Sequence, residues 1–461
     1  MDFILFKAAS NKTKQILTDF LTKGHERSIK AKKNILASFI IKGLSIVISL
    51  ILVPLTINYI NPTQYGIWLT LSSIVAWFSF FDIGFGNGLR NKFAEAIAKG
   101  QEELARIYVS TTYAILCIII SVVLILFLLI NPYLDWSRLL NTTQKMAGEL
   151  SILAEIVFIF FCLRFIFQMV TTVLTANQEP AKASFFDFLG SLFSLIVIFI
   201  LTKTTSGNLI YLGIALSFTP VLVLVASSLW FYSHDYKRFA PSIKYVKFGY
   251  ARNLMSLGLK FFIIQIAALV LFNTDNIIVT QLFGPKEVTT FYVAFKLFSV
   301  VTMIFSIITT PLWSAYTDAF ANNDFEWIKT TLLKMKKIWV LLIIFTILIL
   351  MISPWIFKWW LGNNVEIPFA LSIAMSIYVV VGIWQTIHVY LLNGIGKIKL
   401  QLYMVIISGV INIPLAIFLG KKFGLVGITL TGTLLFLLMG IIFSIQTKKI
   451  INNKANGIWN K

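Results

Sequence analysis

Charged residues are scarce in this chain, and acidic residues are scarcer than basic ones. Only 13% of its 461 residues are charged, with 19 Asp and Glu against 39 Lys and Arg. Soluble proteins carry about 25% charged residues. Hydrophobic residues make up 58% of the chain, and its mean hydropathy is +0.85. A water-soluble body cannot be covered with polar surface from this composition, which excludes soluble enzymes, disordered tails and disulfide scaffolds.

The chain also lacks the patterns that hold metals or nucleotides. It has no G-x-x-x-x-G-K-[ST] loop, no H-E-x-x-H motif and no Cys/His cluster. Its two cysteines, Cys117 and Cys162, fall within apolar runs, where small packing residues are expected. The segments between those runs are too short for a soluble catalytic domain. The sequence therefore predicts a protein that is not an enzyme, with no metal, no cofactor and no nucleic-acid partner.

What the chain has in abundance is long apolar runs. About 20 apolar residues suffice for a helix to cross the hydrocarbon core of a bilayer. The expected fold is therefore an all-α polytopic membrane protein with twelve transmembrane helices. The predicted spans are residues 34–60, 65–88, 108–131, 149–175, 184–202, 209–231, 256–283, 289–317, 337–361, 369–393, 400–420 and 423–446.

The basic residues predict how the chain is oriented, because Lys and Arg gather in loops that stay on the cytoplasmic side. If the N-terminus is cytoplasmic, 28 of the 39 basic residues fall on that side, six fall outside and five lie within spans. This asymmetry predicts an even number of spans and cytoplasmic N- and C-termini. Residues 1–33 mix Lys with apolar residues, which fits either an amphipathic helix on the anionic leaflet or a solvated basic tail.

A weak internal repeat divides the chain into two halves. At an offset of 223 residues, Pro62 aligns with Pro285 and Glu103 aligns with Glu326. Parallel repeats are a transporter architecture with the substrate site between the halves, although chance similarity of apolar helices is the alternative. The expected domains are a basic amphipathic segment 1–33, a six-helix bundle 34–231, a cytoplasmic linker 232–255, a second six-helix bundle 256–446 and a cytoplasmic tail 447–461.

Three spans each carry one cation within a stripe of polar side chains. A charged side chain inside a bilayer costs roughly 2.5–3.5 kcal/mol on insertion scales, so it normally faces a cavity or a partner. We predict a water-filled cavity lined by these groups, whereas stripes of Ser and Thr alone would indicate close helix packing. The cations are Lys42, Arg164 and Lys296, and helical spacing places Ser45, Ser49, Gln168, Thr171 and Ser299 on the same faces.

Two further cations belong to the same prediction. Lys260 lies near the end of a span, where it either faces the cavity or extends its ammonium group to the membrane surface. Arg90 lies at the predicted inner mouth, where it either attracts substrate or serves as an orienting positive charge.

Acidic side chains within the spans are candidates for ion coupling. They are Asp82, Glu155, Asp187 and Asp275. Carboxylates at membrane depth carry protons or bind Na⁺ in transporters, and Asn276 beside Asp275 offers a further oxygen to a cation. The same carboxylates could equally be structural partners of the cations on neighbouring helices, and the sequence leaves both interpretations open.

Two motifs accompany the twelve spans and the parallel halves: P-x-x-Y-G at Pro62–Gly66, and F-D-I-G-F-G-N-G-L-R at Phe81–Arg90. With them the chain resembles the oligosaccharide flippases of the multidrug/oligosaccharidyl-lipid/polysaccharide (MOP) exporter superfamily. The resemblance implies a V-shaped bundle pair with alternating access in the bacterial cytoplasmic membrane. It implies movement of undecaprenyl-pyrophosphate-linked O-antigen or capsule repeat units from the inner to the outer leaflet, coupled to H⁺ or Na⁺. It also implies membrane lipids, a polymerase and glycosyltransferases as partners.

The cation pattern agrees with such a substrate, because Arg and Lys are natural partners of a pyrophosphate. We predict that the five cations attract the headgroup and that the polar stripes hydrogen-bond the sugars. Two alternatives remain. A multidrug or cation antiporter of the same superfamily would favour an acidic cavity, and a polysaccharide-assembly enzyme is disfavoured by the repeat and the short loops.

Overall fold

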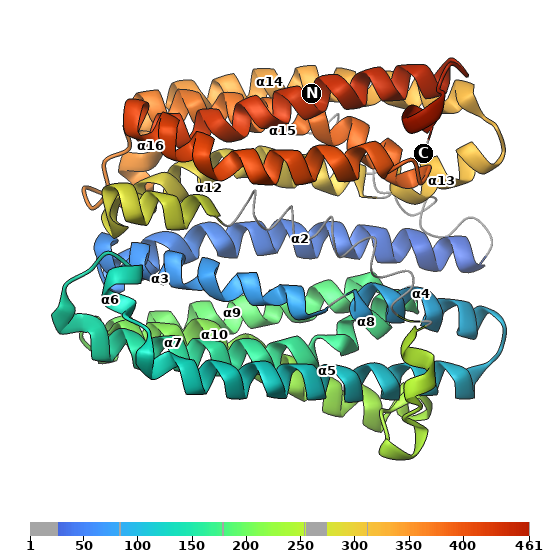
Figure 1. Cartoon of the computed structure of the whole chain (residues 1–461), viewed down its shortest axis with the longest axis horizontal. Coiled ribbons are helices and arrows are strands. Elements are labelled where there is room, and N and C mark those ends of the chain that lie inside the picture. Colours follow the sequence, from blue (N-terminus) through green and yellow to red (C-terminus); the bar gives the residue numbers. More distant parts are fainter. Residues whose placement is uncertain are drawn as a thin grey trace, which may run out of the picture.

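The structure, a computed structural model, describes residues 26–82, 84–177, 179–252, 254, 274–310 and 312–460. Helices dominate these ranges, and they lie side by side in two bundles with nearly parallel axes (Figure 1). Nine of the described helices are long and apolar enough to cross a membrane. The expected all-α, multi-pass fold is confirmed.

The first bundle holds the elements before residue 234. A 3-10 turn at Trp77–Asp82 joins the two helical pieces of the second span, and Gln168 joins those of the fourth. In this bundle α9 lies between α2 and α10, and α7 packs on α10. The helices are α2 (Glu26–Tyr59), α3 (Pro62–Ala76), α4 (Phe85–Ala98), α5 (Glu102–Ile130), α6 (Trp136–Leu139), α7 (Ala147–Phe167), α8 (Met169–Ala176), α9 (Pro180–Thr204) and α10 (Leu209–Ser233).

The second bundle repeats this order of elements. A break at Thr310 separates α12 from α13, as the turn before α4 separates it from α3. At its centre α15 packs against α12, α14 and α16. The helices are residues 274–283, α12 (Pro285–Thr309), α13 (Leu312–Ala321), α14 (Phe325–Leu361), α15 (Phe369–Gly394) and α16 (Lys399–Ile451).

Gly424 makes two spans out of α16. Its φ of 63° lies in the left-handed region, which glycine adopts without strain, and it interrupts the helical backbone. The turn therefore lies one residue beyond the link predicted between residues 420 and 423. The two legs then approach closely, because a Cβ at Gly427 would lie 2.0 Å from the carbonyl oxygen of Leu419.

The segment that follows α10 is folded against the first bundle. It contains three 3-10 turns, at Lys237–Phe239, Ile243–Tyr245 and Phe248–Tyr250. The ring of Phe239 packs edge-on against Phe93 with centroids 5.1 Å apart, and Tyr250 packs in the same way on Tyr108 at 5.6 Å. The end of the molecule where this segment lies is called the linker end.

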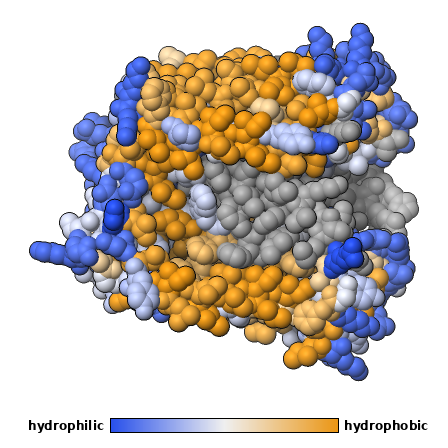
Figure 2. All heavy atoms as spheres, viewed as in Figure 1, coloured by the Kyte–Doolittle hydropathy of each residue, from blue (hydrophilic) through white to orange (hydrophobic). Residues whose placement is uncertain are grey.

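The opposite end, where α3 and α12 begin at Pro62 and Pro285, is called the proline end. Between the two ends, apolar side chains cover the visible sides of both bundles, and hydrophilic side chains gather at both ends (Figure 2). This band is the surface that a bilayer would contact.

Replacing Gly427 with alanine tests the contact between the legs of α16. Because the new methyl group meets backbone rather than a movable side chain, we expect a loss of about 1–3 kcal/mol of stability. The midpoint of thermal unfolding in detergent would fall. Gly43→Ala is the matched control, since a Cβ there meets nothing within 4 Å. Equal midpoints for the two variants would contradict the packing described.

Candidate functional site

At the proline end the two bundles touch through α3 and α12. Both helices begin with a proline, which suits the first turn because the amide hydrogen it lacks would have no helical partner. A Cβ at Gly66 would lie 1.7 Å from the carbonyl oxygen of Pro285. The Thr289 hydroxyl donates to the carbonyl of Pro62 at 2.6 Å. The proline end is therefore closed by a backbone contact that glycine alone permits.

Polar side chains extend this closure. The hydroxyls of Thr70 and Thr280 lie 2.6 Å apart and form a buried hydrogen bond. At the rim, the side-chain amide of Asn364 donates to Asn58 at 2.7 Å. Each pair joins the first bundle to the second, so parting the bundles at this end requires these bonds to break.

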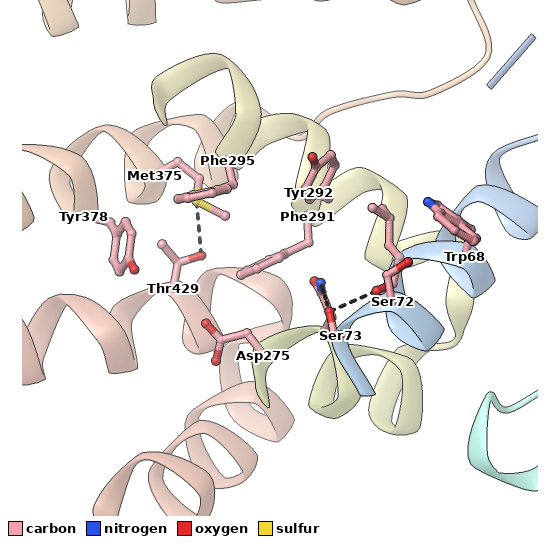
Figure 3. A pocket seen from close by; sticks show the side chains of 12 residues that line it. Trp68, Ser72, Ser73, Asp275, Phe291, Tyr292, Phe295, Met375, Tyr378 and Thr429 are labelled. Carbon is pink, nitrogen blue, oxygen red and sulfur yellow. Dashed lines mark hydrogen bonds between the residues drawn. The ribbon is translucent and has the colours of Figure 1, made fainter. Parts of the chain in front are cut away.

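A cavity of about 450 Å³ lies between the two bundles next to this closure (Figure 3). We call it the inter-bundle cavity. Asp275 and Asn276 line it from the second bundle, and the Asn276 amide donates to the Ser73 hydroxyl of α3 at 2.8 Å. Asp275 forms no ion pair or hydrogen bond with any residue that the structure describes. The rest of the lining is Trp68, Leu69, Ser72, Phe291, Tyr292, Phe295, Met375, Tyr378 and Thr429.

A second cavity, of about 340 Å³, lies within the first bundle and contains the predicted pair Arg164 and Gln168. We call it the arginine cavity. Its polar lining continues with Ser72, Ser79 and Ser217, and aromatic rings from α3 and α7 complete it. Arg164 is exposed, and it lies near enough to the Asp187 carboxylate for electrostatic attraction.

One helix separates the two cavities. Trp68 and Ser72, both on α3, line the inter-bundle cavity and the arginine cavity alike. The first offers a carboxylate to a cation, and the second offers a guanidinium to an anion. The arrangement can therefore hold groups of opposite charge on the two faces of α3.

The other predicted cations are not gathered at these cavities. Lys42 on α2 and Lys296 on α12 are half-buried, and neither forms an ion pair within the described part of the chain. Arg90 is exposed on α4 at the linker end, and Lys260 lies outside the described residues. Of the four predicted cations that the structure describes, only Arg164 lines either cavity, and the roles of all the others stay predictions.

Two ion pairs lie on or beside α4, the helix that carries Arg90. Lys92 and Lys99 reach the carboxylate of Glu95 at 2.8 and 2.6 Å. Their hydrogen bonds, Lys92 first, lower the pKa of Glu95 to about 2. Glu95 therefore stays ionised at neutral pH and offsets part of the positive charge on this surface.

The hydroxyls of the predicted polar stripes donate to the backbone of their own helices. Ser45 donates to Ile41 at 2.9 Å, and Ser49 to Ile46 at 2.7 Å. Thr171 donates to the carbonyl of Gln168 at 2.7 Å, and Ser299 to that of Lys296 at 2.8 Å. Serine and threonine commonly bond in this way where no water is available. Their oxygens remain able to accept hydrogen bonds, so their role in binding sugars stays a prediction.

The predicted coupling residues lie in different places. Asp275 and Asn276 share the inter-bundle cavity, and Asp187 lies beside Arg164. Glu155 is half-buried on α7 and lines neither cavity. The backbone of Asp82 is described as part of the 3-10 turn before α4, but its side chain lies outside the described residues.

Sequence reasoning missed the aromatic walls of the site. Trp68 and Tyr378 lie in long apolar runs, where aromatic residues ordinarily pack against lipid or core. Thr429 was missed for a different reason, because a threonine hydroxyl in a span usually bonds its own helix, as that of Thr429 does to the carbonyl of Leu425 at 3.1 Å. The adjacent serines Ser72 and Ser73 within the second span were the one usable signal.

Comparison with known proteins identifies relatives of this chain. A model of the polysaccharide biosynthesis protein family matches residues 31–316, and a MatE family model matches residues 261–418. An O-antigen export protein of Yersinia pseudotuberculosis is 23% identical over 405 residues, which cover 83% of this chain and 88% of the relative. An O-antigen transporter of Salmonella typhi is 21% identical over 414 residues, covering 87% and 90%.

Solved structures share the fold. A multidrug resistance MATE transporter of the MOP superfamily, in an inward-facing conformation, superposes with a TM-score of 0.73. It is 15% identical, and the match covers 91% of this chain and 98% of the transporter. The expected MOP-type architecture is confirmed.

Replacing Gly66 with valine tests the closure at the proline end. The side chain cannot fit against Pro285, so we expect the two bundles to part there. Cysteines at Asn58 and Asn364, now hydrogen-bonded to each other, would report the change as a lower yield of oxidative cross-linking. Gly148→Val is the control, because a Cβ there meets nothing within 4 Å. Unchanged cross-linking in the Gly66 variant would show that the closure does not depend on this contact.

Proposed function

Because the chain belongs to the polysaccharide biosynthesis protein family, we propose that it is a flippase for lipid-linked oligosaccharide repeat units of a surface polysaccharide such as O-antigen or capsule. The names of the relatives, an O-antigen export protein and an O-antigen transporter, support this substrate class. The cargo would be a short oligosaccharide on undecaprenyl pyrophosphate, carried from the inner to the outer leaflet.

The position of Arg164 is the single observation on which the proposal rests. Arg164 is a permanent cation at membrane depth, it lines a cavity, and it has no ion-pair partner within the described residues. Guanidinium groups bind phosphates through short, paired hydrogen bonds. A pyrophosphate in the arginine cavity would meet Arg164, while Gln168 and the serines of the lining would face the first sugars.

Transport would proceed by alternating access of the two bundles. The bundles 34–231 and 256–446 would move as units, and the closure at the proline end would open and close between them. Removing a charged headgroup from water is favourable only if the cavity supplies equivalent partners. The arginine cavity would supply them for the headgroup, and the prenyl tail would remain in lipid.

A cation gradient would drive this cycle through the inter-bundle cavity. Asp275 would bind H⁺ or Na⁺, with Asn276 and Thr429 as further oxygen ligands for Na⁺. Asp82, Glu155 and Asp187 remain further candidates for the coupling group. Asp187 is better placed to orient Arg164, because the two charges attract each other.

We place the linker end, together with both termini, in the cytoplasm. The distribution of Lys and Arg supports this orientation, with 28 on that side against six on the other. The membrane would be the bacterial cytoplasmic membrane, and the polymerase and glycosyltransferases of the same pathway would act beside the flippase.

One observation favours a second candidate, a multidrug or cation antiporter. The inter-bundle cavity carries a carboxylate and aromatic rings, a lining suited to organic cations. Flux of a cationic dye that competes with the lipid-linked cargo would favour this alternative. Flux of the lipid-linked cargo alone favours the flippase.

Substituting Arg164 tests the anion site. We expect Arg164→Ala to lower the flux of labelled lipid-linked oligosaccharide into vesicles by about 10- to 100-fold, the loss of a charge-assisted hydrogen bond. Arg164→Lys would recover part of the flux, since it keeps the charge but not the paired geometry. Lys203→Ala, an exposed cation over the Phe199 ring, is the control. Unchanged flux in a membrane-inserted Lys42→Ala/Arg164→Ala/Lys296→Ala variant would refute the cationic site.

Substituting Asp275 tests the coupling. We expect Asp275→Asn to transport at the same rate with and without an imposed pH or Na⁺ gradient, because the amide cannot bind the driving cation. Asp187→Asn, the same change beside Arg164, should keep its response to the gradient. The flux of both variants is measured with and without the gradient. A gradient response retained by Asp275→Asn would exclude this residue as the coupling group.

A further inference from the structure

The segment from Tyr236 to Arg252 is basic and contains no acidic residue. Its cations are Lys237, Arg238, Lys244, Lys247 and Arg252, and all of them are exposed. Between them stand two apolar side chains that also face outward. Ile243 is 94% exposed and Phe248 is 56% exposed. Orientation by positive charge explains the cations, but it does not explain why apolar side chains point away from the protein.

These apolar side chains are held outward by a fixed backbone. On one side of Ile243, the amide of Ser242 donates to the Ser110 hydroxyl at 3.1 Å. On the other side, the amide of Lys247 donates to the Thr111 hydroxyl at 3.0 Å. Both acceptors belong to α5, so the turn that carries Ile243 is attached to the bundle at both ends.

Arg106 strengthens this attachment from beneath. Its Nε donates to the carbonyl of Ala240 at 3.0 Å, and its guanidinium lies 4.3 Å from the ring centroid of Tyr245. Tyr245 therefore faces the bundle while Ile243 and Lys244 face away. The exposure of Ile243 follows from this packing and not from a loose loop.

The attachment points lie at a particular depth along α5. The apolar part of this helix ends at Ile130, and about 20 residues cross a hydrocarbon core of about 30 Å. Counting that length back from Ile130 reaches Thr111. The turn is therefore bound at the boundary between hydrocarbon and headgroups, and not in the aqueous space beyond it.

The segment also projects sideways. In Figure 1 residues 234–252, the yellow-green stretch that follows α10, extend away from α5 on the side opposite the second bundle. At this depth, the surroundings of the first bundle on that side are lipid. Aliphatic and aromatic side chains flanked by Lys are the pattern of segments that lie in a membrane interface.

We propose that residues 240–250 form an anchor in the interfacial layer of the anionic leaflet. Ile243 and Phe248 insert among the lipid chains, and Lys244 and Lys247 contact phosphate groups. Arg238 is engaged by the carboxylate of Glu102 and contributes less. The anchor fixes the linker end of the first bundle at the membrane surface. Its preference for anionic lipid rests on the cytoplasmic orientation proposed above.

Depth measurements with a fluorescent label test the anchor. In a Cys117→Ala/Cys162→Ala background, Ile243→Cys is labelled with an environment-sensitive dye and the full-length protein is reconstituted into vesicles. Glu326→Cys is the matched control, because it is exposed at the same end. It precedes the apolar run 338–357 of α14 by twelve residues, or about 18 Å of helix.

With phosphatidylglycerol in the vesicles, we expect nitroxide lipids to quench the label at 243 several-fold more than that at 326. Aqueous iodide would show the reverse. Adding Lys244→Gln or Lys247→Gln should lower the ratio of membrane-inserted to water-exposed label by about fivefold for each charge lost. Equal iodide quenching at 243 and 326 would overturn the proposal, as would equal depth in neutral and anionic vesicles. A label at 243 shielded from both quenchers would indicate a second protein copy over the segment and would also overturn it.

A separate measurement tests the orientation on which the lipid preference rests. A membrane-impermeant maleimide should fail to modify Glu326→Cys in intact cells and should modify it in inverted vesicles. Modification in intact cells would show that the proposed orientation is wrong. The depth measurement would still report independently whether Ile243 lies in the membrane interface.

Discussion

The structure depends on the close approach of α3 to α12 at Gly66. Because glycine has no Cβ, the backbone of one bundle lies directly against Pro285 of the other. The contact fixes where α3 sits, and α3 supplies the shared wall of both cavities through Trp68 and Ser72. A larger residue at this position would separate the bundles and change both binding spaces at once.

A second constraint comes from the surrounding hydrocarbon. Polar groups at membrane depth must find partners within the protein, because lipid chains offer none. The hydroxyls of Ser45, Ser49 and Ser299 meet this demand by bonding to the preceding turn of their own helices. Such residues therefore cost little to place in a span, and their presence alone is weak evidence for a cavity. Arg164 does not meet this demand within its own helix, so its position at a cavity is better evidence for a binding site.

The fold was largely predictable and the site only partly so. The apolar runs suffice to predict the spans, because hydrophobic length acts locally along the chain, and the weak repeat suffices to predict the two halves. Pro62 and Pro285 could be paired from the repeat, but their contact could not, since it depends on how the bundles close. Arg164 and Gln168 share a face because helix geometry requires it. Lys42 and Lys296 fit the same pattern on their own helices, yet the pattern says nothing about which faces meet in space.

The wall shared by the two cavities has a thermodynamic consequence. Suppose that a ligand in either cavity displaces Trp68, whose side chain borders both. The free energy of moving the Trp68 side chain then contributes to the binding free energy of a ligand in the other cavity. Linkage is reciprocal, so any factor by which the ion changes affinity for the headgroup is the factor by which the headgroup changes affinity for the ion. The indole ring of Trp68 would then contribute to this heterotropic coupling, which favours exchange when the two ligands weaken each other's binding and co-transport when they strengthen it.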